Sequence, residues 1–451
     1  MRKTLEQKMC KRSLGYALFK NYIARPAFFL FYKKIDVVGV NEVPDEGPVI
    51  FTPNHQNALM DALAILFTKN RQIVFLARAD IFKKPFIISI LHFFRILPIF
   101  RKRDGGISAE NNQETFDMIL KVLESGNAVG IMPEGMHNKM KRLQMLQKGV
   151  FRLALQAQEK YGATPMIKII PVGIEFTNTY KFRSSLIVNY GKAIEVSDFY
   201  NMYVENSAKA YKQMQDTLTE KIKEGMVDIT NDQHYNEIER LRVLYLKRVI
   251  QKNGLDFGNA EHRLQMQQKI IAVLQEYAKS FPDEMNTLCI AVEDYFTIIE
   301  KNNQRDWVIE RQPYSFVCLL WGCILALIGF PFWILGMLFN YLPYKMSALA
   351  SSKVKDPQFI TSVQYVASLA IFPLYYLIAI VLLVLFIPCF WGKLIMPMLM
   401  FPLGLFAFKY YILMKKLCAR FRFCWGNKKE FKKAIELRKT IFEKMDYVFE
   451  I

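Results

Sequence analysis

Short runs of β-branched and aromatic residues alternate with stretches of helical periodicity over the first half of the chain. The predicted strands are Ile35–Val40, Val49–Thr52, Ile73–Leu76, Ala128–Met132, Ile167–Val172 and Leu186–Asn189. The predicted helices cover roughly residues 58–69, 80–94, 108–124 and 145–161. Strands that alternate with helices in this way predict an α/β fold, in which a mostly parallel sheet is flanked by helices.

An apolar stretch at Leu14–Phe31 precedes the alternating region, but Lys20, Asn21 and Arg25 interrupt it. A membrane-spanning helix needs about 20 residues with few charges. We therefore expect residues 1–34 to form an amphipathic segment that lies in the membrane interface, the alternative being a helix of a soluble core. The basic N-terminus has neither the apolar core nor the cleavage site of a secretory signal.

We place the α/β region at residues 35–200. After it, the composition of the chain changes twice. Residues 201–312 are charged, helix-prone and poor in Gly and Pro, so we expect an accessory helical region there. Residues 313–414 contain three long apolar runs, Phe316–Phe339, about Val366–Ile387 and Leu394–Leu413. Residues 415–451 form a basic tail.

The basic residues between and after the apolar runs constrain how the chain crosses a membrane. The segment with Lys345, Lys353 and Lys355 and the basic tail both favour the cytoplasmic side. Three full crossings cannot place both there. We expect the first run to re-enter and turn back at Gly329–Pro331, and the last two to form a spanning hairpin with the α/β region on the cytoplasmic side. Three ordinary spans are the alternative.

Composition supports a membrane partner. The net charge is +19, which indicates an anionic partner, and 52% of the residues are hydrophobic, with 36 Phe. Apolar runs of this length are typical of membrane proteins and unlike nucleic-acid binders, so no nucleic acid is expected as a partner. None of the seven cysteines has C-x-x-C spacing, which suits a protein that faces the reducing cytoplasm.

The most informative segment for chemistry is Val49–Asp61, VIFTPNHQNALMD. A predicted strand ends in Pro-Asn-His just before a helix, so His55 stands at a strand-to-helix junction, where functional groups of open α/β sheets gather. Asp61 is the sole carboxylate between Glu46 and Asp80 and is the natural partner of the imidazole. The two side chains meet only if the backbone turns between them, because residues six apart on a helix point in different directions. A lone His at a strand end is otherwise often structural.

The pattern N-H-x5-D, followed downstream by M-P-E-G, resembles the glycerophospholipid acyltransferase family, which includes glycerol-3-phosphate and 1-acylglycerol-3-phosphate acyltransferases. The resemblance covers about residues 35–195 as an ordered set of blocks. It implies that residues 35–200 are a catalytic domain, with His55 as general base and Asp61 as its partner. The family usually has four residues between His and Asp, whereas this chain has five, as one eukaryotic branch of glycerol-3-phosphate acyltransferases does.

Further blocks imply substrate-binding residues. The segment Ile96–Arg103 is similar to the second block, in which an Arg after a short strand contacts the acceptor phosphate; Arg101 matches it, with Arg103 beside it. The segment Gly130–Asn138 is similar to the third block and implies Glu134 and Gly135 at the acceptor. The usual Thr-Arg-Ser after this Glu-Gly is absent. Four cations could replace the missing one: Lys139, Lys141, Arg142 and Lys148.

Two further features bear on chemistry. The segment Lys168–Gly173 is similar to a fourth block associated with the acyl-donor site, although an ordinary core strand explains it equally well. His137 could pair with His55 at a metal, but no Cys or acidic set at ligand spacing accompanies them, so no metal is expected.

The expected function is that of an integral membrane O-acyltransferase of phospholipid synthesis without a cofactor. The donor would be acyl-CoA or acyl-carrier protein as co-substrate. The acceptor would be 1-acylglycerol-3-phosphate, glycerol-3-phosphate or another lysophospholipid, drawn from the membrane lipids. The alternative from another class is a non-catalytic membrane adaptor that binds partners through residues 201–312.

Overall fold

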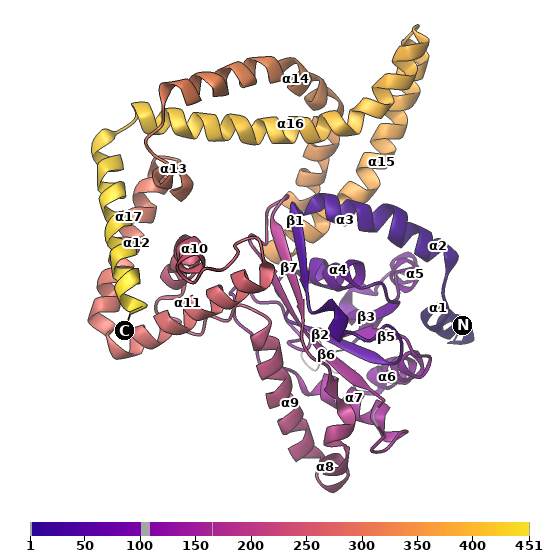
Figure 1. Cartoon of the computed structure of the whole chain (residues 1–451). Coiled ribbons are helices and arrows are strands. Elements are labelled where there is room, and N and C mark those ends of the chain that lie inside the picture. The colour runs from indigo at the N-terminus through magenta and orange to yellow at the C-terminus, as the bar shows by residue number, and fades with distance from the viewer. Residues whose placement is uncertain (1, 101–108, 165, 451) are drawn as a thin grey trace. The chain divides into compact units, whose positions relative to one another are not determined.

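The computed structural model describes residues 2–100, 109–164 and 166–450 (Figure 1). The chain divides into two compact units. Unit 1 contains residues up to Asp228 together with two later segments, Asn259–Leu264 and Val354–Tyr365. Unit 2 contains Ile229–Gly258, Gln265–Lys353 and Val366–Ile451.

A mostly parallel sheet forms the centre of unit 1, which confirms the expected fold class. Its strands are β1 (Lys34–Val38), β2 (Val49–Pro53), β3 (Ile73–Arg78), β4 (Ile96–Ile99), β5 (Ala128–Gly130), β6 (Lys168–Phe176), β7 (Ser185–Tyr190) and β8 (Ile194–Glu195). The order is β1-β7-β6-β2-β5-β3-β4, with β8 paired to the start of β6. The strands from β6 to β4 are parallel, whereas β7 pairs antiparallel with β6 and carries the parallel β1.

Helices cover both faces of this sheet because its central strands are apolar on both faces. All five residues of β2 are buried. Ile50 faces a core that α6 (Ala109–Glu124), α7 (Lys148–Glu159) and α9 (Ser207–Glu224) complete. Phe51 points to the other face, where its ring lies 6.1 Å from that of Tyr190. Alternation of side chains along a strand accounts for this division. Helix α4 (Ala58–Thr68) lies on that second face, with Thr68 Oγ1 2.7 Å from Tyr190 Oη.

The helical stretch before the sheet has two faces. It consists of α2 (Leu14–Leu18), a π-helical turn (Phe19–Ala24) and α3 (Arg25–Phe31), after α1 (Arg2–Cys10). Phe28 and Phe31 are buried in unit 1, and the Phe28 ring lies 5.2 Å from that of Phe67 in α4. Other apolar side chains are exposed: Leu14, Leu18, Tyr22, Ile23 and Phe29. An exposed apolar face suits the membrane interface, and that location stays a prediction.

The described residues of unit 1 also form short connections and further helices. These include the 3-10 turns Val40–Glu42, Ala79–Ile81 and Val196–Phe199, and the helices α5 (Pro85–Phe93) and α8 (Tyr200–Glu205). A further 3-10 turn, Pro357–Phe359, comes from the late segment Val354–Tyr365.

Most of the charged helical region lies in unit 2 as amphipathic helices. These are α10 (Tyr235–Lys252), α12 (Pro282–Lys301), α13 (Asp306–Glu310) and α17 (Lys428–Val448), together with most of α11 (Ala260–Ser280). Ion pairs join α17 to its neighbours. Asp446 accepts hydrogen bonds from Tyr245 and Arg248 of α10, and Asp306 accepts one from Arg438 at 2.7 Å.

Three helices of the described chain are long and apolar enough to cross a membrane: α14 (Phe316–Ser352), α15 (Ile360–Phe386) and α16 (Phe390–Trp425). The chain breaks at Ile387–Cys389, between the second and third apolar runs of the sequence. The predicted reversal at Gly329–Pro331 is wrong, since α14 continues through it. A proline removes one hydrogen bond and bends a helix without ending it when packing holds both sides. Here Gly329 packs on Tyr410 of α16.

Candidate active site

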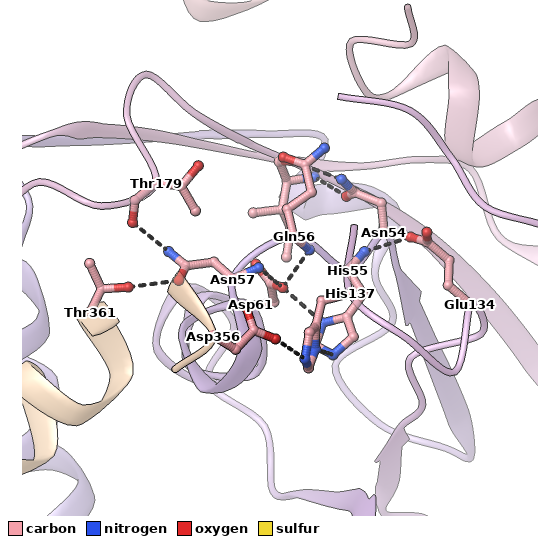
Figure 2. Close-up of polar contacts among 11 residues, drawn as sticks. Asn54, His55, Gln56, Asn57, Asp61, Glu134, His137, Thr179, Asp356 and Thr361 are labelled. Carbon is pink, nitrogen blue, oxygen red and sulfur yellow. Dashed lines mark hydrogen bonds and ion pairs between the residues drawn. The ribbon is translucent and has the colours of Figure 1, made fainter. Parts of the chain in front are cut away.

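His55 lies just beyond the carboxyl end of β2, in the turn that leads into α4 (Figure 2). The neighbouring Asn54 fixes this turn to the adjacent strand β6. Its Nδ2 donates to Ile174 O at 3.1 Å, and its Oδ1 accepts from Ile174 N at 2.7 Å. The His55 side chain is 12% exposed, so it is shielded but not sealed in the core.

Asp61 holds the imidazole of His55. Its Oδ2 lies 2.9 Å from His55 Nδ1 and also accepts from the backbone N–H groups of Gln56, at 2.9 Å, and Asn57, at 2.7 Å. The carboxyl group is fully buried in the first turn of α4, where the helix dipole favours a negative charge. The backbone reverses at Ala58, whose φ is 41°. This turn accommodates the extra residue between His55 and Asp61. It is also the change in backbone direction that the sequence analysis required for the two side chains to meet.

Glu134 accepts hydrogen bonds from two backbone N–H groups, one of which is that of His55. Its Oε1 accepts from His55 N at 2.6 Å and its Oε2 from Gln144 N at 2.9 Å. Burial raises the pKa of this carboxyl group to about 8, and the two N–H donors oppose the shift. Gly135 follows with φ +66°, and a Cβ there would lie 3.2 Å from Gln147 Cγ. The structure thus brings Glu134 to His55, with both carboxylate oxygens bonded to backbone.

A second histidine, His137, lies against the opposite nitrogen of His55. His137 Nδ1 is 3.1 Å from His55 Nε2, and the two rings meet edge to face with centroids 4.9 Å apart (Figure 2). Burial and the neighbouring His55 lower the pKa of His137 to about 4, so this imidazole is neutral at pH 7. Sequence reasoning considered His137 only as a metal ligand and missed this contact.

The late segment Val354–Tyr365 contributes side chains to the same site within unit 1. Phe359 packs edge to face on His137, with ring centroids 4.9 Å apart, and Asp356 Oδ2 lies 3.9 Å from His137 Nε2. Thr361 donates to Asn57 Oδ1 at 2.7 Å (Figure 2). No local sequence signal marked these residues, because they follow the His–Asp motif by about 300 positions.

The expected phosphate-binding cations have different placements. Arg101 and Arg103 lie outside the described residues, just after β4. Lys148 is exposed in the first turn of α7, and Lys139 is also exposed. Lys141 is paired with Glu175 and donates to Phe176 O at 3.0 Å, while Arg142 is half-buried.

Arg78, at the carboxyl end of β3, is a cation that the sequence analysis did not single out. Its positive charge is among the causes that lower the pKa of His137, after burial and the neighbouring His55. It is paired with Asp80 at 2.5 Å and remains partly exposed.

One group of potential metal ligands occurs in the part of the chain that the structure describes. His234, Glu237 and Cys289 of unit 2 place one ligand atom each within 4.8 Å of one another. Structural zinc sites usually have four such ligands, and burial raises the pKa of the Cys289 thiol to about 12, which disfavours the thiolate that binds metal. The expectation of no metal stays a prediction.

Comparison with known proteins assigns the sheet domain to a class. Residues 34–175 match the Acyltransferase family, which makes this part of unit 1 an acyltransferase domain. The chain is 27% identical over 210 residues to the 1-acyl-sn-glycerol-3-phosphate acyltransferase of Borreliella burgdorferi, spanning 47% of this chain and 74% of that protein. It is also 27% identical over 136 residues to glycerol-3-phosphate O-acyltransferase 1 of Saccharomyces cerevisiae, covering 29% of this chain and 18% of the yeast protein. Both relatives are acyltransferases of glycerol phosphates by name, so this chain is similar to the glycerophospholipid acyltransferases.

Among solved structures, the chain is similar to the 1-acyl-sn-glycerophosphate (LPA) acyltransferase of Thermotoga maritima. The identity is 17% and the TM-score is 0.32, with 49% of this chain and 80% of that chain covered.

Proposed function

We propose that this chain is a membrane-bound O-acyltransferase that esterifies glycerol-3-phosphate or 1-acylglycerol-3-phosphate with a fatty acyl group from a thioester. The observation that carries the proposal is the hydrogen-bonded pair of His55 and Asp61 at the carboxyl end of β2, inside an acyltransferase domain. The names of the relatives support the two acceptors, and we retain both because the matched relatives include enzymes of each kind.

In the proposed reaction His55 is the general base. Its Nε2 takes the proton of the acceptor hydroxyl as the oxygen attacks the thioester carbonyl carbon. When the tetrahedral intermediate collapses, the C–S bond breaks, and the imidazolium returns the proton to the leaving thiolate. Asp61 favours the tautomer with a proton on Nδ1 and stabilises the imidazolium by its negative charge. Because a hydroxyl of the acceptor attacks directly, no covalent acyl-enzyme and no cofactor are required.

The acceptor phosphate is assigned to the basic residues around this sheet edge. Arg101 and Arg103 follow β4, and Arg78 ends β3, the neighbouring parallel strand. Carboxyl ends of parallel strands share one edge of a sheet, so the guanidinium group of Arg78 can approach a phosphate held near His55. Arg101 and Arg103 lie outside the described residues and are candidates from the sequence motif alone. A forked guanidinium binds phosphate through two hydrogen bonds. Lys148 remains a further candidate at the start of α7.

The membrane location follows from α14, α15 and α16, and we place the catalytic domain on the cytoplasmic side. Asp356 and Thr361 contact His137 and Asn57, so the segment between α14 and α15 lies on the same side as the site. The candidate spans of the described chain all start after residue 312. Both ends of α14 are then on one side, and we propose that α14 lies in the membrane without crossing it, while α15 and α16 form a spanning hairpin.

An acceptor screen tests the proposed function. Purified protein in detergent is supplied with labelled acyl-CoA or acyl-carrier protein, and glycerol-3-phosphate, 1-acylglycerol-3-phosphate and other lysophospholipids are offered separately. Esterification of a glycerol phosphate supports the proposal, whereas transfer to none of these acceptors with either donor refutes it. A non-catalytic adaptor that binds through residues 201–312 would give that second result.

A further inference from the structure

We propose that His137 is a positioning residue that covers the basic nitrogen of His55 until an acceptor hydroxyl replaces it, and thereby suppresses hydrolysis of the acyl thioester. The inference rests on the proposed function, because it assigns a role at the same site. It explains why a second imidazole occupies the position where the acceptor must bind.

The hydrogen bonds around His55 assign the tautomers of both rings. Asp61 Oδ2 already accepts two backbone N–H groups and can only accept from the imidazole, so His55 carries its proton on Nδ1. His55 Nε2 then has a free lone pair. A neutral His137 donates its Nδ1–H to that lone pair across 3.1 Å. The lone pair of His55 Nε2 is therefore occupied by an imidazole N–H, which is too weakly acidic to transfer its proton to the base.

An uncovered general base beside a thioester would activate water as readily as an alcohol. Water would attack the carbonyl carbon, the C–S bond would break, and free fatty acid and thiol would result. The imidazole of His137 fills the place where such a water would bind to Nε2. An acceptor hydroxyl can displace it, because one neutral hydrogen bond is exchanged for another and the rest of the bound acceptor contributes additional binding energy.

The late segment Val354–Tyr365 holds His137 in this position. The Phe359 ring packs edge to face on the imidazole, and the Asp356 carboxylate lies 3.9 Å from its other nitrogen. The backbone beyond His137 is fixed as well, since Asn138 N donates to His55 O at 3.1 Å. Contacts with the late segment and with the backbone at His55 thus support His137.

The test compares two rates measured on the same full-length protein. Release of free fatty acid from acyl-CoA without acceptor reports hydrolysis, and ester formation with acceptor reports transfer. We expect His137→Ala to raise the ratio of hydrolysis to transfer about tenfold, which corresponds to about 1.4 kcal/mol. His137→Gln, which keeps a side-chain N–H donor, should restore part of the difference. Phe359→Ala should shift the ratio in the same direction.

His92→Ala is the matched control, because His92 is a half-buried histidine of α5 in the same unit. Its ratio should equal that of the wild type. A general loss of folded protein lowers both rates and leaves the ratio unchanged. An unchanged or lower ratio in His137→Ala overturns the inference, and if that variant is inactive, the ratio of Phe359→Ala decides in the same way. Failure of the proposed function is separate, because it appears as wild-type protein that transfers to no glycerol phosphate.

Discussion

Replacing Asp61 by Asn removes the negative charge beside His55 with almost no change in shape. The amide oxygen of the introduced side chain can still accept the N–H groups of Gln56 and Asn57, so the turn into α4 should survive. What is lost is the stabilisation of the imidazolium that forms when His55 takes the acceptor proton. The variant should therefore fold and remain in the membrane, with a reduced rate of the chemical step.

The size of the reduction follows from the geometry. A hydrogen bond to a charged group contributes about 1.5–3 kcal/mol. Two unit charges about 4 Å apart at an effective dielectric constant of about 20 interact by about 4 kcal/mol. Asp61 is fully buried, so solvent does not weaken this interaction appreciably. At about 1.4 kcal/mol for each factor of ten, kcat should fall by about 10- to 1000-fold.

The assay is the initial rate of ester formation at saturating acyl donor, with the acceptor varied so that kcat and KM separate. Asp198→Asn is the control, since Asp198 is an exposed carboxylate in the 3-10 turn Val196–Phe199 of the same unit. A fall in kcat of less than about threefold in Asp61→Asn, with the protein folded, would refute the assigned role of the charge.

Three further predictions concern stability and topology. Folding raises the pKa of Glu134 from 4.5 to about 8, so its contribution to stability is complete below about pH 4.5 and is lost as the pH rises through 8. Glu134→Gln should flatten this decline of stability with pH in thermal unfolding curves, and an unchanged decline would exclude Glu134 as its source. Gly173→Ala should lower the midpoint of thermal unfolding, because a Cβ there would lie 1.9 Å from Gly225 O. Gly149 lies in α7 with open space around it, so Gly149→Ala should raise the free energy of unfolding by up to about 1 kcal/mol. Equal effects of the two substitutions would contradict the packing described. Single cysteines at Ser315 and Lys353, in a cysteine-free background, should be labelled from the same membrane face, and labelling from opposite faces would show that α14 crosses.

Local patterns were sufficient to predict the core of the site. The buried apolar run of β2 and the helix-forming residues after Asn57 placed His55 at a strand-to-helix junction, and α4 begins there. The contact with Asp61 depended on a backbone reversal, which the extra residue of the motif required. The unusual φ of Ala58 supplies it, although nothing in an alanine identifies that conformation beforehand.

Contacts between distant segments could not be predicted in the same way. His137 and Phe359 are ordinary residues of their own segments, and only the fold places them beside His55. The directions of β1 and β7 relative to the other strands could not be predicted either, because a buried strand has the same apolar pattern in either direction. At Gly329–Pro331 the local rule for helix breaking was wrong, because packing of Gly329 on α16 maintains a helix that the proline weakens.

The most direct test of the central claim is the initial rate of acyl transfer by His55→Ala protein, compared with wild type at equal amounts in the membrane fraction. If Nε2 of His55 is the base, the variant should stay in the membrane and lose about 10²- to 10⁴-fold in the rate of transfer to glycerol phosphates. Turnover within a few-fold of wild type would contradict the account.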